Sequence, residues 1–226
     1  MISVVMPAYN ASEFIDAAIE SILNQTYRDF EFIIINDAST DNTLDIINAY
    51  AAKDTRIKVL NQPKNAGYTQ AIKWGIKEAK YQWIARMDAD DISLPERLQK
   101  QIEAANKNPN VVVWGTYIRH INSQGDIVSN GVSVGAKTEA DFHENIDNGH
   151  LVSLPHPTWL VKKEVLIKSG GYDSSFEPAE DFELLSRLID YGPLLVVPEH
   201  LLLYRVHSQS ISMQKFFFQQ KITRFV

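Results

Sequence analysis

Three carboxylates crowd into four residues of the chain, because Asp88, Asp90 and Asp91 follow directly after an apolar run that ends at Met87. Carboxylates this close repel one another, and one or more of them should resist ionising. In an extended segment, residues i and i+2 point to the same side, so Asp88 and Asp90 can converge on one partner. A hard divalent cation with oxygen ligands would remove the repulsion. The alternative is that the aspartates favour the start of a following helix, at about 0.3–1 kcal/mol each, and the cluster alone leaves both interpretations open.

The acidic cluster ends one strand in a pattern of alternating strands and helices. Short apolar runs predict buried strands over residues 2–6, 32–35, 57–60 and 83–87. Between and after them, apolar residues at the i, i+3, i+4, i+7 spacing predict helices around residues 15–22, 44–51, 68–79 and 98–105. Ser93 to Glu96 has the spacing of a capping box and predicts the start of the last of these helices. This order predicts a parallel sheet covered by helices on both faces.

The second half of the chain has a less regular pattern and predicts a mixed set of elements. Strands are expected over residues 111–121, 127–134, 157–161, 194–197 and 201–206, and helices over 137–147, up to 170–171, and over 180–191. No linker, low-complexity tract or repeat interrupts the pattern. We therefore expect a single α/β domain over residues 1–212, with a nucleotide-binding half at 1–110, a mixed half at 111–212, and a tail at 213–226.

Length and composition are those of an ordinary soluble globular protein, with 226 residues, 45% hydrophobic and 22% charged. The chain has no cysteine, which excludes disulfides and thiolate metal sites and fits a reducing compartment, so we expect a cytoplasmic location. No apolar run reaches the length of a membrane span, and no signal peptide is visible. The net charge of −6 argues against a nucleic-acid-binding protein, although an anionic ligand can still bind where positive charge is supplied locally.

Three polar segments follow predicted strands, at residues 7–10, 36–41 and 88–91. In open parallel sheets, ligands bind beyond the carboxyl ends of the strands, so these segments are the expected binding edge. The first strand is not followed by GxGxxG, and GxxxxGK[ST] is absent, which argues against a dinucleotide fold and a P-loop. A nucleotidyltransferase would need a Gly-rich phosphate loop near the first strand, and that loop is also missing. A pyrophosphate here would have to be held mainly by a metal and side chains.

Four motifs along the chain together carry a family resemblance. They include "INDASTDNT", "RMDADDISLPERL", "FEPAEDFELLSRL" and "YRVHSQSIS", in this order. The chain up to about Ser212 resembles the family 2 glycosyltransferases of the GT-A fold. The resemblance implies a mostly parallel central sheet with helices on both faces plus a smaller mixed sheet. It also implies an inverting transfer from a nucleoside-diphosphate sugar, with UDP expected, to a hydroxyl acceptor in bacterial polysaccharide or glycoconjugate synthesis.

The resemblance also assigns roles on the donor side. Asp88 matches the aspartate that touches the ribose, and Asp90 matches the ligand of Mn²⁺ or Mg²⁺ on the diphosphate. His207, in the "YRxH" segment, matches a third metal ligand, and an imidazole ligand favours Mn²⁺. Asp37 matches the acidic residue that recognises the nucleobase. The loop that walls the base pocket in the family matches Pro7, Ala8 and Tyr9. A second donor-side loop matches Asn65 and Gly67, and Ala89 lies between the two aspartates of the acidic motif.

The catalytic base of the family falls in an acidic pair at a helix start, which matches Glu180-Asp181 with Asp181 as the base. The helix N-terminus should lower the pKa of Asp181. Burial beside a diphosphate should raise it, and we expect burial to win in the donor complex because a general base gains from a pKa nearer the working pH. Glu180 is expected mainly to favour the helix dipole.

Four further candidates keep more than one interpretation. Arg86 is either a phosphate partner or one half of an ion pair at the edge of the site, and Asp91 extends the acidic motif without an assigned role. His156 is a candidate for a wall of the active site. The tail combines Phe216 to Phe218 with cationic residues, which is typical of a membrane-surface or partner-binding segment.

The acceptor and the activity itself are also left with alternatives. We expect a glycan, a lipid-linked acceptor or another hydroxyl acceptor, at the inner face of the membrane if the tail binds there. The oligomeric state is not predicted. The alternative to an enzyme is a non-catalytic nucleotide- or glycan-binding module that keeps the same fold, since a fold does not prove activity.

Overall fold

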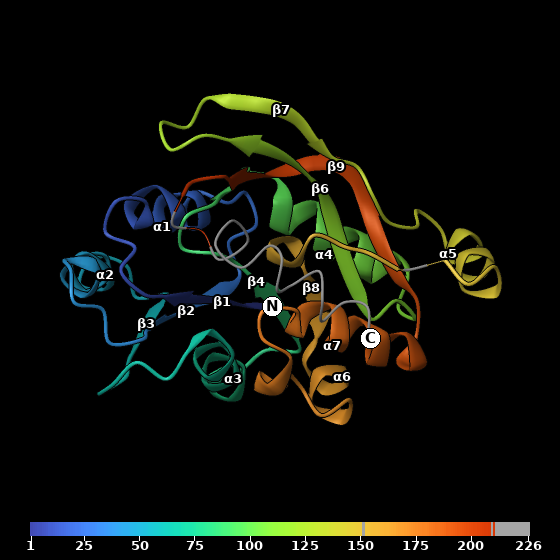
Figure 1. Ribbon diagram of the computed structural model, residues 1–226, viewed down its shortest axis with the longest axis horizontal. Helices are drawn as coiled ribbons and strands as arrows, with labels where there is room; N and C mark the ends of the chain where they lie inside the picture. The colour runs from blue at the N-terminus through green and yellow to red at the C-terminus, as the bar shows by residue number, and fades with distance from the viewer. Residues whose placement is uncertain (151, 209, 211–226) are drawn as a thin grey trace.

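A computed structural model describes residues 1–150, 152–208 and 210, and it shows one sheet that runs through both halves of the chain. The first half supplies four parallel strands in the order β3-β2-β1-β4 (Figure 1). Their bounds are β1 Ile2–Ala8, β2 Phe30–Asn36, β3 Ile57–Asn61 and β4 Trp83–Arg86. β1 and β2 are buried along their whole length, as expected for continuous apolar runs covered on both faces.

The second half continues the same sheet with mixed strand directions. β8 (Leu160–Lys162) pairs antiparallel with β4, and β6 (Val113–Ile121) pairs antiparallel with β8. β9 (Leu194–Arg205) runs parallel to β6, while β5 (Ile92–Ser93) and β7 (Ile127–Val132) lie antiparallel at the margins. The expected smaller mixed sheet is therefore joined to the parallel part by hydrogen bonds. The fold class predicted from the sequence is confirmed.

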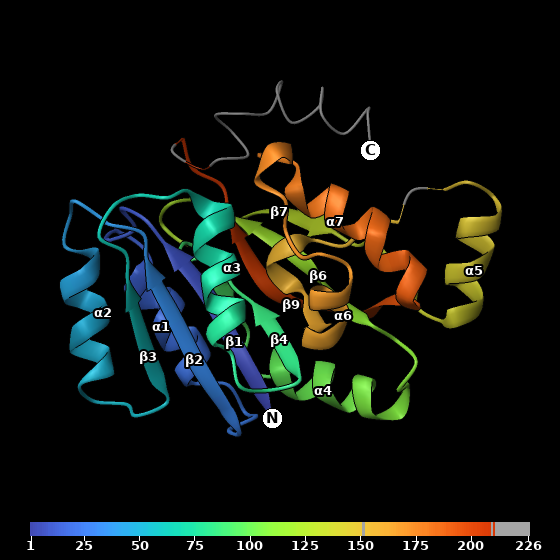
Figure 2. The ribbon, with the colours of Figure 1, turned by 90° about the horizontal axis from the view of Figure 1, so that it is seen from below.

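Helices cover both faces of this sheet (Figures 1 and 2). α1 (Ile15–Leu23) and α3 (Tyr68–Glu78) lie on opposite faces of β1 and β2, and α6 (Lys163–Lys168) and α7 (Glu180–Leu188) lie on the same side as α3. α4 (Arg97–Lys107) packs against β6 and β9, and its predicted stripe of Leu98, Ile102 and Ala105 is buried. α2 (Thr43–Ala51) lies beside β3.

Close packing of α3 on the sheet depends on Gly75. A Cβ atom at this position would lie 2.5 Å from Val5 Cγ1 and 2.6 Å from Ile35 Cδ1. Any larger residue would push the helix away from β1 and β2. The glycine thus fixes the distance between α3 and the two strands whose ends form the expected binding edge.

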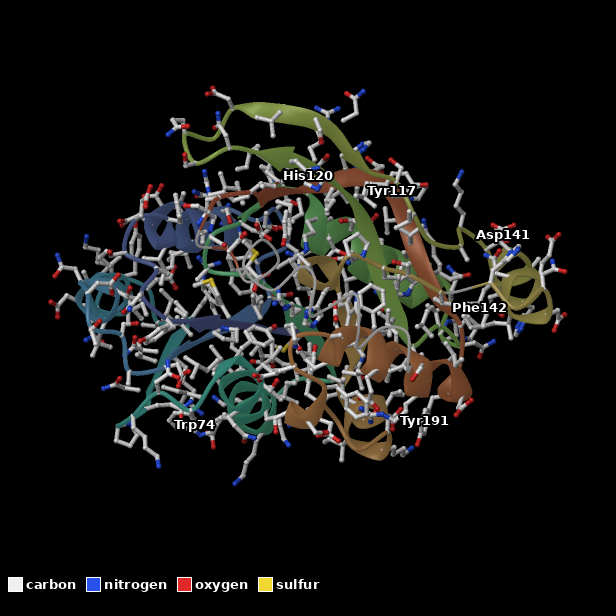
Figure 3. The ribbon with its side chains drawn as sticks, viewed as in Figure 1. Trp74, Tyr117, His120, Asp141, Phe142 and Tyr191 are labelled. Atoms are coloured by element: carbon white, nitrogen blue, oxygen red, sulfur yellow. The ribbon has the colours of Figure 1, made fainter. Side chains whose placement is uncertain are left out.

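The second-half helix predicted over residues 137–147 is present as α5 (Glu139–Asp147). Its first turn is closed by a capping box in which Thr138 and Asp141 exchange hydrogen bonds. Phe142 is its one buried residue and anchors the helix to the rest of the molecule. Figure 3 shows Asp141 and Phe142 at the end of the molecule away from α2.

Three predicted details of secondary structure are wrong. Ser93 does not cap a helix, because it pairs with Leu202 as part of β5, its hydroxyl accepts a hydrogen bond from Gln25 Nε2 at 3.1 Å, and α4 begins only at Arg97. The strand predicted over 157–161 starts late, because His156–Thr158 form a 3₁₀ turn before β8. The two strands expected over 194–206 are one long strand, which pairs with β6 across register shifts.

No helix in the described part of the chain is long and apolar enough to cross a membrane. The expected tail over residues 213–226, with its aromatic and cationic side chains, lies outside the described residues.

Candidate active site

The parallel register brings the three polar segments of the first half to one edge of the sheet. Ala8 of β1 lies opposite Asn36 of β2, and the Asp37 amide donates to Ala8 O at 2.9 Å. Val5 of β1 lies opposite Arg86 of β4, so the acidic turn that follows Arg86 emerges at the same edge. Pro7 and Ala8 are buried within β1, whereas Tyr9 just beyond the strand is 50% exposed.

The acidic turn gathers its three carboxylates around a small volume. One oxygen each from Asp88, Asp90 and Asp91 lies within 4.8 Å of the others. The short turn places Ala89 between them, buried against the core. Asp91 is buried, and its Oδ2 has no hydrogen-bond partner among the described residues. Burial raises the pKa of Asp91 well above its usual range, and the neighbouring carboxylates raise it further.

The end of β9 and the residues after it complete this cluster from far along the chain. His207 Nε2 lies 2.9 Å from Asp90 Oδ2, across 117 residues of sequence. The Arg205 amide donates to Asp91 Oδ1 at 2.8 Å, and Arg205 Nε donates to the Asp90 carbonyl at 2.7 Å. The ring of Phe14 lies 4.8 Å from both the His207 ring and the Arg205 guanidinium. β9 therefore fixes the acidic turn and presents an imidazole to it.

Two buried arginines lie beneath the turn. Arg86 is 4% exposed; it forms an ion pair with Asp88 and donates to the Tyr68 hydroxyl. Arg97 is fully buried and donates to the Arg86 carbonyl at 2.6 Å. Burial and the charge of Arg86 lower the pKa of Arg97 to about 9. Of the two sequence interpretations of Arg86, the structure shows the ion pair, although Arg86 is buried rather than placed at an edge.

These residues fit a divalent cation. Carboxylate oxygens are hard ligands, and the imidazole of His207 is a common ligand for Mn²⁺ and related ions. Burial raises the pKa of Asp88, Asp90 raises it further, and Arg86 opposes both effects. A cation among the three carboxylates would satisfy the unpartnered oxygen of Asp91 and reduce the repulsion between charges.

Asp37 organises the loop on the other side of the edge. Its Oδ1 accepts from the Ala66 amide at 2.8 Å and from Gln62 Nε2 at 2.9 Å, and its Oδ2 accepts from the Gly67 amide at 3.0 Å. Asn65 Nδ2 donates to the Asp37 carbonyl at 3.3 Å. An ionised carboxylate has about four acceptor positions, so Asp37 keeps one of them, on Oδ2, for a further donor.

The second half contributes Glu180 and Asp181 at the start of α7. Glu180 is 8% exposed, and its Oε2 has no partner among the described residues. Burial and the charge of Asp181 raise the pKa of Glu180 to about 7. Burial also raises the pKa of Asp181, against the Phe182 amide, which donates to Asp181 Oδ1 at 2.9 Å, and against Arg86. Burial is thus the largest effect on the pKa of Asp181.

His156 lies in the wall between these two regions. Its Nε2 is 2.7 Å from the Tyr172 hydroxyl, and its ring contacts Trp159 with centroids 4.6 Å apart. Burial and the charge of Arg86 hold the pKa of His156 well below its usual range, so the ring is neutral. Burial raises the pKa of Tyr172, and the charges of Glu180 and Asp181 raise it further, which shows that this tyrosine is close to the acidic pair.

Residues of this region that were not singled out from the sequence include Tyr68, Tyr172 and Glu177. Tyr68 binds Arg86, Tyr172 binds His156, and Glu177 accepts from the Thr69 amide at 2.9 Å. The last contact spans 108 residues, so no local pattern could indicate it.

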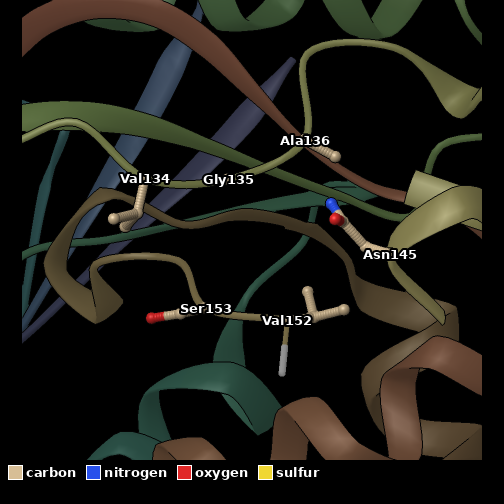
Figure 4. Close-up of a pocket in the computed structure, with 6 residues that line it drawn as sticks. All are labelled: Val134, Gly135, Ala136, Asn145, Val152 and Ser153. Carbon is tan, nitrogen blue, oxygen red and sulfur yellow. The ribbon is translucent and has the colours of Figure 1, made fainter. Parts of the chain in front are cut away.

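A separate pocket of about 220 Å³ lies between the connection from β7 to α5 and the segment before His156 (Figure 4). It is lined by Val134, Gly135, Ala136, Asn145, Val152 and Ser153. None of these side chains titrates, and none belongs to the groups described above.

Comparison with known structures agrees with this arrangement. TarS from Staphylococcus aureus, solved in complex with UDP-GlcNAc, superimposes with a TM-score of 0.79 at 19% identity, covering 99% of this chain and 64% of that one. A mannosyltransferase from Pyrobaculum calidifontis, in complex with GDP-Man and Mn²⁺, gives a TM-score of 0.71 at 16% identity, covering 95% and 59%. At these identities the likeness is one of fold, and the fold is that of the GT-A glycosyltransferases.

Sequence comparison gives the family. The family model described as "Glycosyl transferase family 2" matches residues 3–170 of this chain. The O-antigen biosynthesis glycosyltransferase WbnJ of Escherichia coli is 35% identical over 220 residues, covering 93% of this chain and 81% of that protein. An uncharacterized glycosyltransferase of Haemophilus influenzae is 33% identical over 224 residues, covering 94% and 67%. The chain belongs to glycosyltransferase family 2, as the resemblance of its motifs implied.

Proposed function

We propose that the chain is an inverting, metal-dependent glycosyltransferase that moves a sugar from a nucleoside-diphosphate sugar to a hydroxyl group. The observation that carries the proposal is the contact between Asp90 and His207, which would form part of a cation site at the edge of the sheet where the nucleotide is expected. The UDP and GDP-Man complexes of the fold relatives support a nucleotide-sugar donor, and a UDP-sugar is our first choice.

On the donor side, Asp90 and His207 would hold Mn²⁺ or Mg²⁺, and Asp88 would bind the ribose. A divalent cation bound there supplies positive charge to the diphosphate leaving group and acts as a Lewis acid. Asp37 would accept one hydrogen bond from the nucleobase through the free position on Oδ2, with Pro7, Ala8 and Tyr9 as the wall of the base pocket. Asn65 and Gly67 belong to the loop that Asp37 holds against this pocket.

On the acceptor side, Asp181 would take the proton from the acceptor hydroxyl as the oxygen attacks the anomeric carbon. Its Oδ1 is engaged by the Phe182 amide, which leaves Oδ2 as the proton acceptor. The raised pKa of Asp181 suits a general base. Attack from the side opposite the diphosphate would invert the anomeric configuration. His156 and Tyr172 would form a neutral wall between the two sides.

The acceptor is proposed to be a glycan or a lipid-linked sugar of a bacterial polysaccharide. Similarity to WbnJ, an O-antigen biosynthesis glycosyltransferase, and to a chondroitin synthase of Escherichia coli supports this class.

A screen of nucleotide sugars tests the proposal. Thermal shift with and without Mn²⁺ should single out one donor, because a bound ligand stabilises the folded state by RT ln(1 + [L]/Kd). That donor should then release its nucleotide slowly in the presence of Mn²⁺ and faster with the acceptor. Binding without any nucleotide release would favour a non-catalytic binding module instead.

A further inference from the structure

The first turn of α3 is held by two carboxylates that come from different halves of the chain. Asp37, at the end of β2, accepts from the amides of Ala66 and Gly67. Glu177, just before α7, accepts from the amide of Thr69 at 2.9 Å. Amides at a helix N-terminus lack partners within the helix, and the partial positive charge there favours carboxylates. The turn therefore joins the donor loop to the segment that leads to Asp181.

The second carboxylate lies beside the backbone of Gly67, whose left-handed conformation favours glycine. The φ of Gly67 is +90°, and a Cβ atom added there would lie 3.9 Å and 4.0 Å from the two carboxylate oxygens of Glu177. Glu177 thus lies over the backbone of the loop and is partly shielded from solvent. This placement explains how one side chain reaches the amide of Thr69 from a distant part of the sequence.

Two backbone hydrogen bonds order the segment that contains Glu177 and the proposed base. The Ala179 amide donates to Phe176 O at 2.7 Å, and the Glu183 amide donates to Ala179 O at 3.2 Å as α7 begins. Asp181 is four residues after Glu177 along this bonded path. A shift of Glu177 would therefore be passed on to Asp181.

The same turn also reaches the acidic cluster. Tyr68, the first residue of α3, accepts from Arg86, and Arg86 forms the ion pair with Asp88. α3 is thus hydrogen-bonded to the base segment through Thr69 and to Arg86 through Tyr68, and Arg86 in turn pairs with Asp88. Of the links among them, the Glu177–Thr69 bond ties the base segment to the turn.

We propose that Glu177 is a positioning residue that sets the place of Asp181 relative to the bound donor by binding the N-terminus of α3. The inference rests on the proposed function, in which Asp181 is the base. Glu177 itself touches neither the donor nor the acceptor in this account. Its effect is on the geometry of proton transfer, where a displacement of about 1 Å can cost on the order of 100-fold in rate.

Three substitutions of Glu177 separate the effect of its side-chain length from the effect of its charge. Glu177→Gln keeps an oxygen at the same reach and should retain kcat within about threefold. Glu177→Asp keeps the charge but is one methylene shorter, and Glu177→Ala removes both, so each should lower kcat by about 10–100-fold with the donor Kd nearly unchanged. Glu164→Ala is the matched control, because Glu164 is 68% exposed in a surface ion pair on α6. Unchanged kcat in both the Asp and Ala variants, or a loss confined to donor binding, would overturn the proposal.

Hydrogen exchange tests the hydrogen bond between the Thr69 amide and Glu177 without an activity measurement. The Thr69 amide should exchange faster in Glu177→Ala and Glu177→Asp than in the wild type and Glu177→Gln, with the midpoint of thermal unfolding used to confirm that each variant is folded. If no nucleotide sugar is turned over by the wild type, the proposed function fails while the exchange result still stands. If the wild type is active and Thr69 exchange is the same in all four proteins, the tie proposed for Glu177 is wrong.

Discussion

The two acidic regions of the site differ in what surrounds their carboxylates. In the turn at residues 88–91, each aspartate has a nitrogen partner: Arg86 for Asp88, His207 for Asp90, and the Arg205 amide for Asp91. In the pair at the start of α7, the described residues place no cation in hydrogen-bond contact with Glu180 or Asp181. In the proposed function, the first region would hold a cation in fixed geometry, and the second would gain and lose a proton.

Arg86 is the residue that both regions share. It is in contact with Asp88, and its charge also opposes, from a distance, the rise in pKa that burial causes at Glu180 and Asp181. The charge of Asp88 acts in the opposite direction on Asp181. Because the buried guanidinium of Arg86 lies near both acidic regions, the charge of one region influences the pKa values in the other. The predictions below separate their roles.

The largest effect is expected for Asp181→Asn. Loss of a general base lowers turnover by about 10²- to 10⁴-fold, whereas donor binding through the acidic turn should change by less than about threefold. Steady-state kcat and a donor Kd from calorimetry measure the two quantities. Asp147→Asn, an exposed carboxylate on α5, is the control. Near-normal turnover in a folded Asp181→Asn protein would show that Asp181 is not the catalytic base.

The acidic turn should show the reverse pattern. Asp90→Asn and His207→Ala should each weaken Mn²⁺ binding in the presence of a nucleoside diphosphate by at least about 10–100-fold, because each removes a proposed ligand. Electron paramagnetic resonance of free Mn²⁺ gives the affinity without any turnover. Asp181→Asn should bind Mn²⁺ as the wild type does. Equal Mn²⁺ affinity in all these proteins would place the cation elsewhere.

A smaller effect, on stability, is expected from Glu180. Because its pKa is raised from 4.5 to about 7 in the folded protein, the folded state holds the proton more tightly than the unfolded state. The stabilisation is complete below about pH 4.5 and is lost as the pH rises through about 7. Denaturant unfolding should show that the wild type loses roughly 2–3 kcal/mol of its free energy of unfolding between pH 4.5 and pH 8 because of this group. Glu180→Gln should not show this loss. Parallel pH profiles for the two proteins would contradict this account of the pair.

The smallest effect is expected in the wall between the regions. Tyr172→Phe removes the hydrogen bond to His156 and leaves its ring nitrogen without that partner, which should cost about 1–2 kcal/mol of the free energy of unfolding. Turnover should fall only a few-fold, because neither residue takes part in proton transfer. Urea unfolding and kcat measure both effects. A loss of turnover as large as that of Asp181→Asn would make Tyr172 a catalytic residue.

Elements with a local signature could be predicted from the sequence. The four parallel strands and the helices between them follow from apolar spacing, and α4 shows how far this reaches. Its stripe of Leu98, Ile102 and Ala105 is buried as expected, but its start is not at Ser93. Ser93 instead belongs to β5, which pairs with β9, a strand about a hundred residues later in the chain. A capping pattern carries no information about such a distant partner.

The same limit applies to the site. The family motifs indicated Asp90 and His207, which the structure brings into contact. They gave no sign that Arg97 would be fully buried beneath the turn, since an arginine in a surface helix is expected to reach solvent. They also did not indicate Glu177, whose partner is a backbone amide and therefore leaves no trace in the side-chain pattern.

The difference between the two regions is tested most directly by the stereochemistry of the product. If the cation site lies at the leaving diphosphate and Asp181 activates the acceptor on the opposite side, transfer is a single displacement. Proton NMR of the first product, recorded before any mutarotation or further transfer, should then show an anomeric configuration inverted relative to the donor. A product with the configuration of the donor retained would contradict the account.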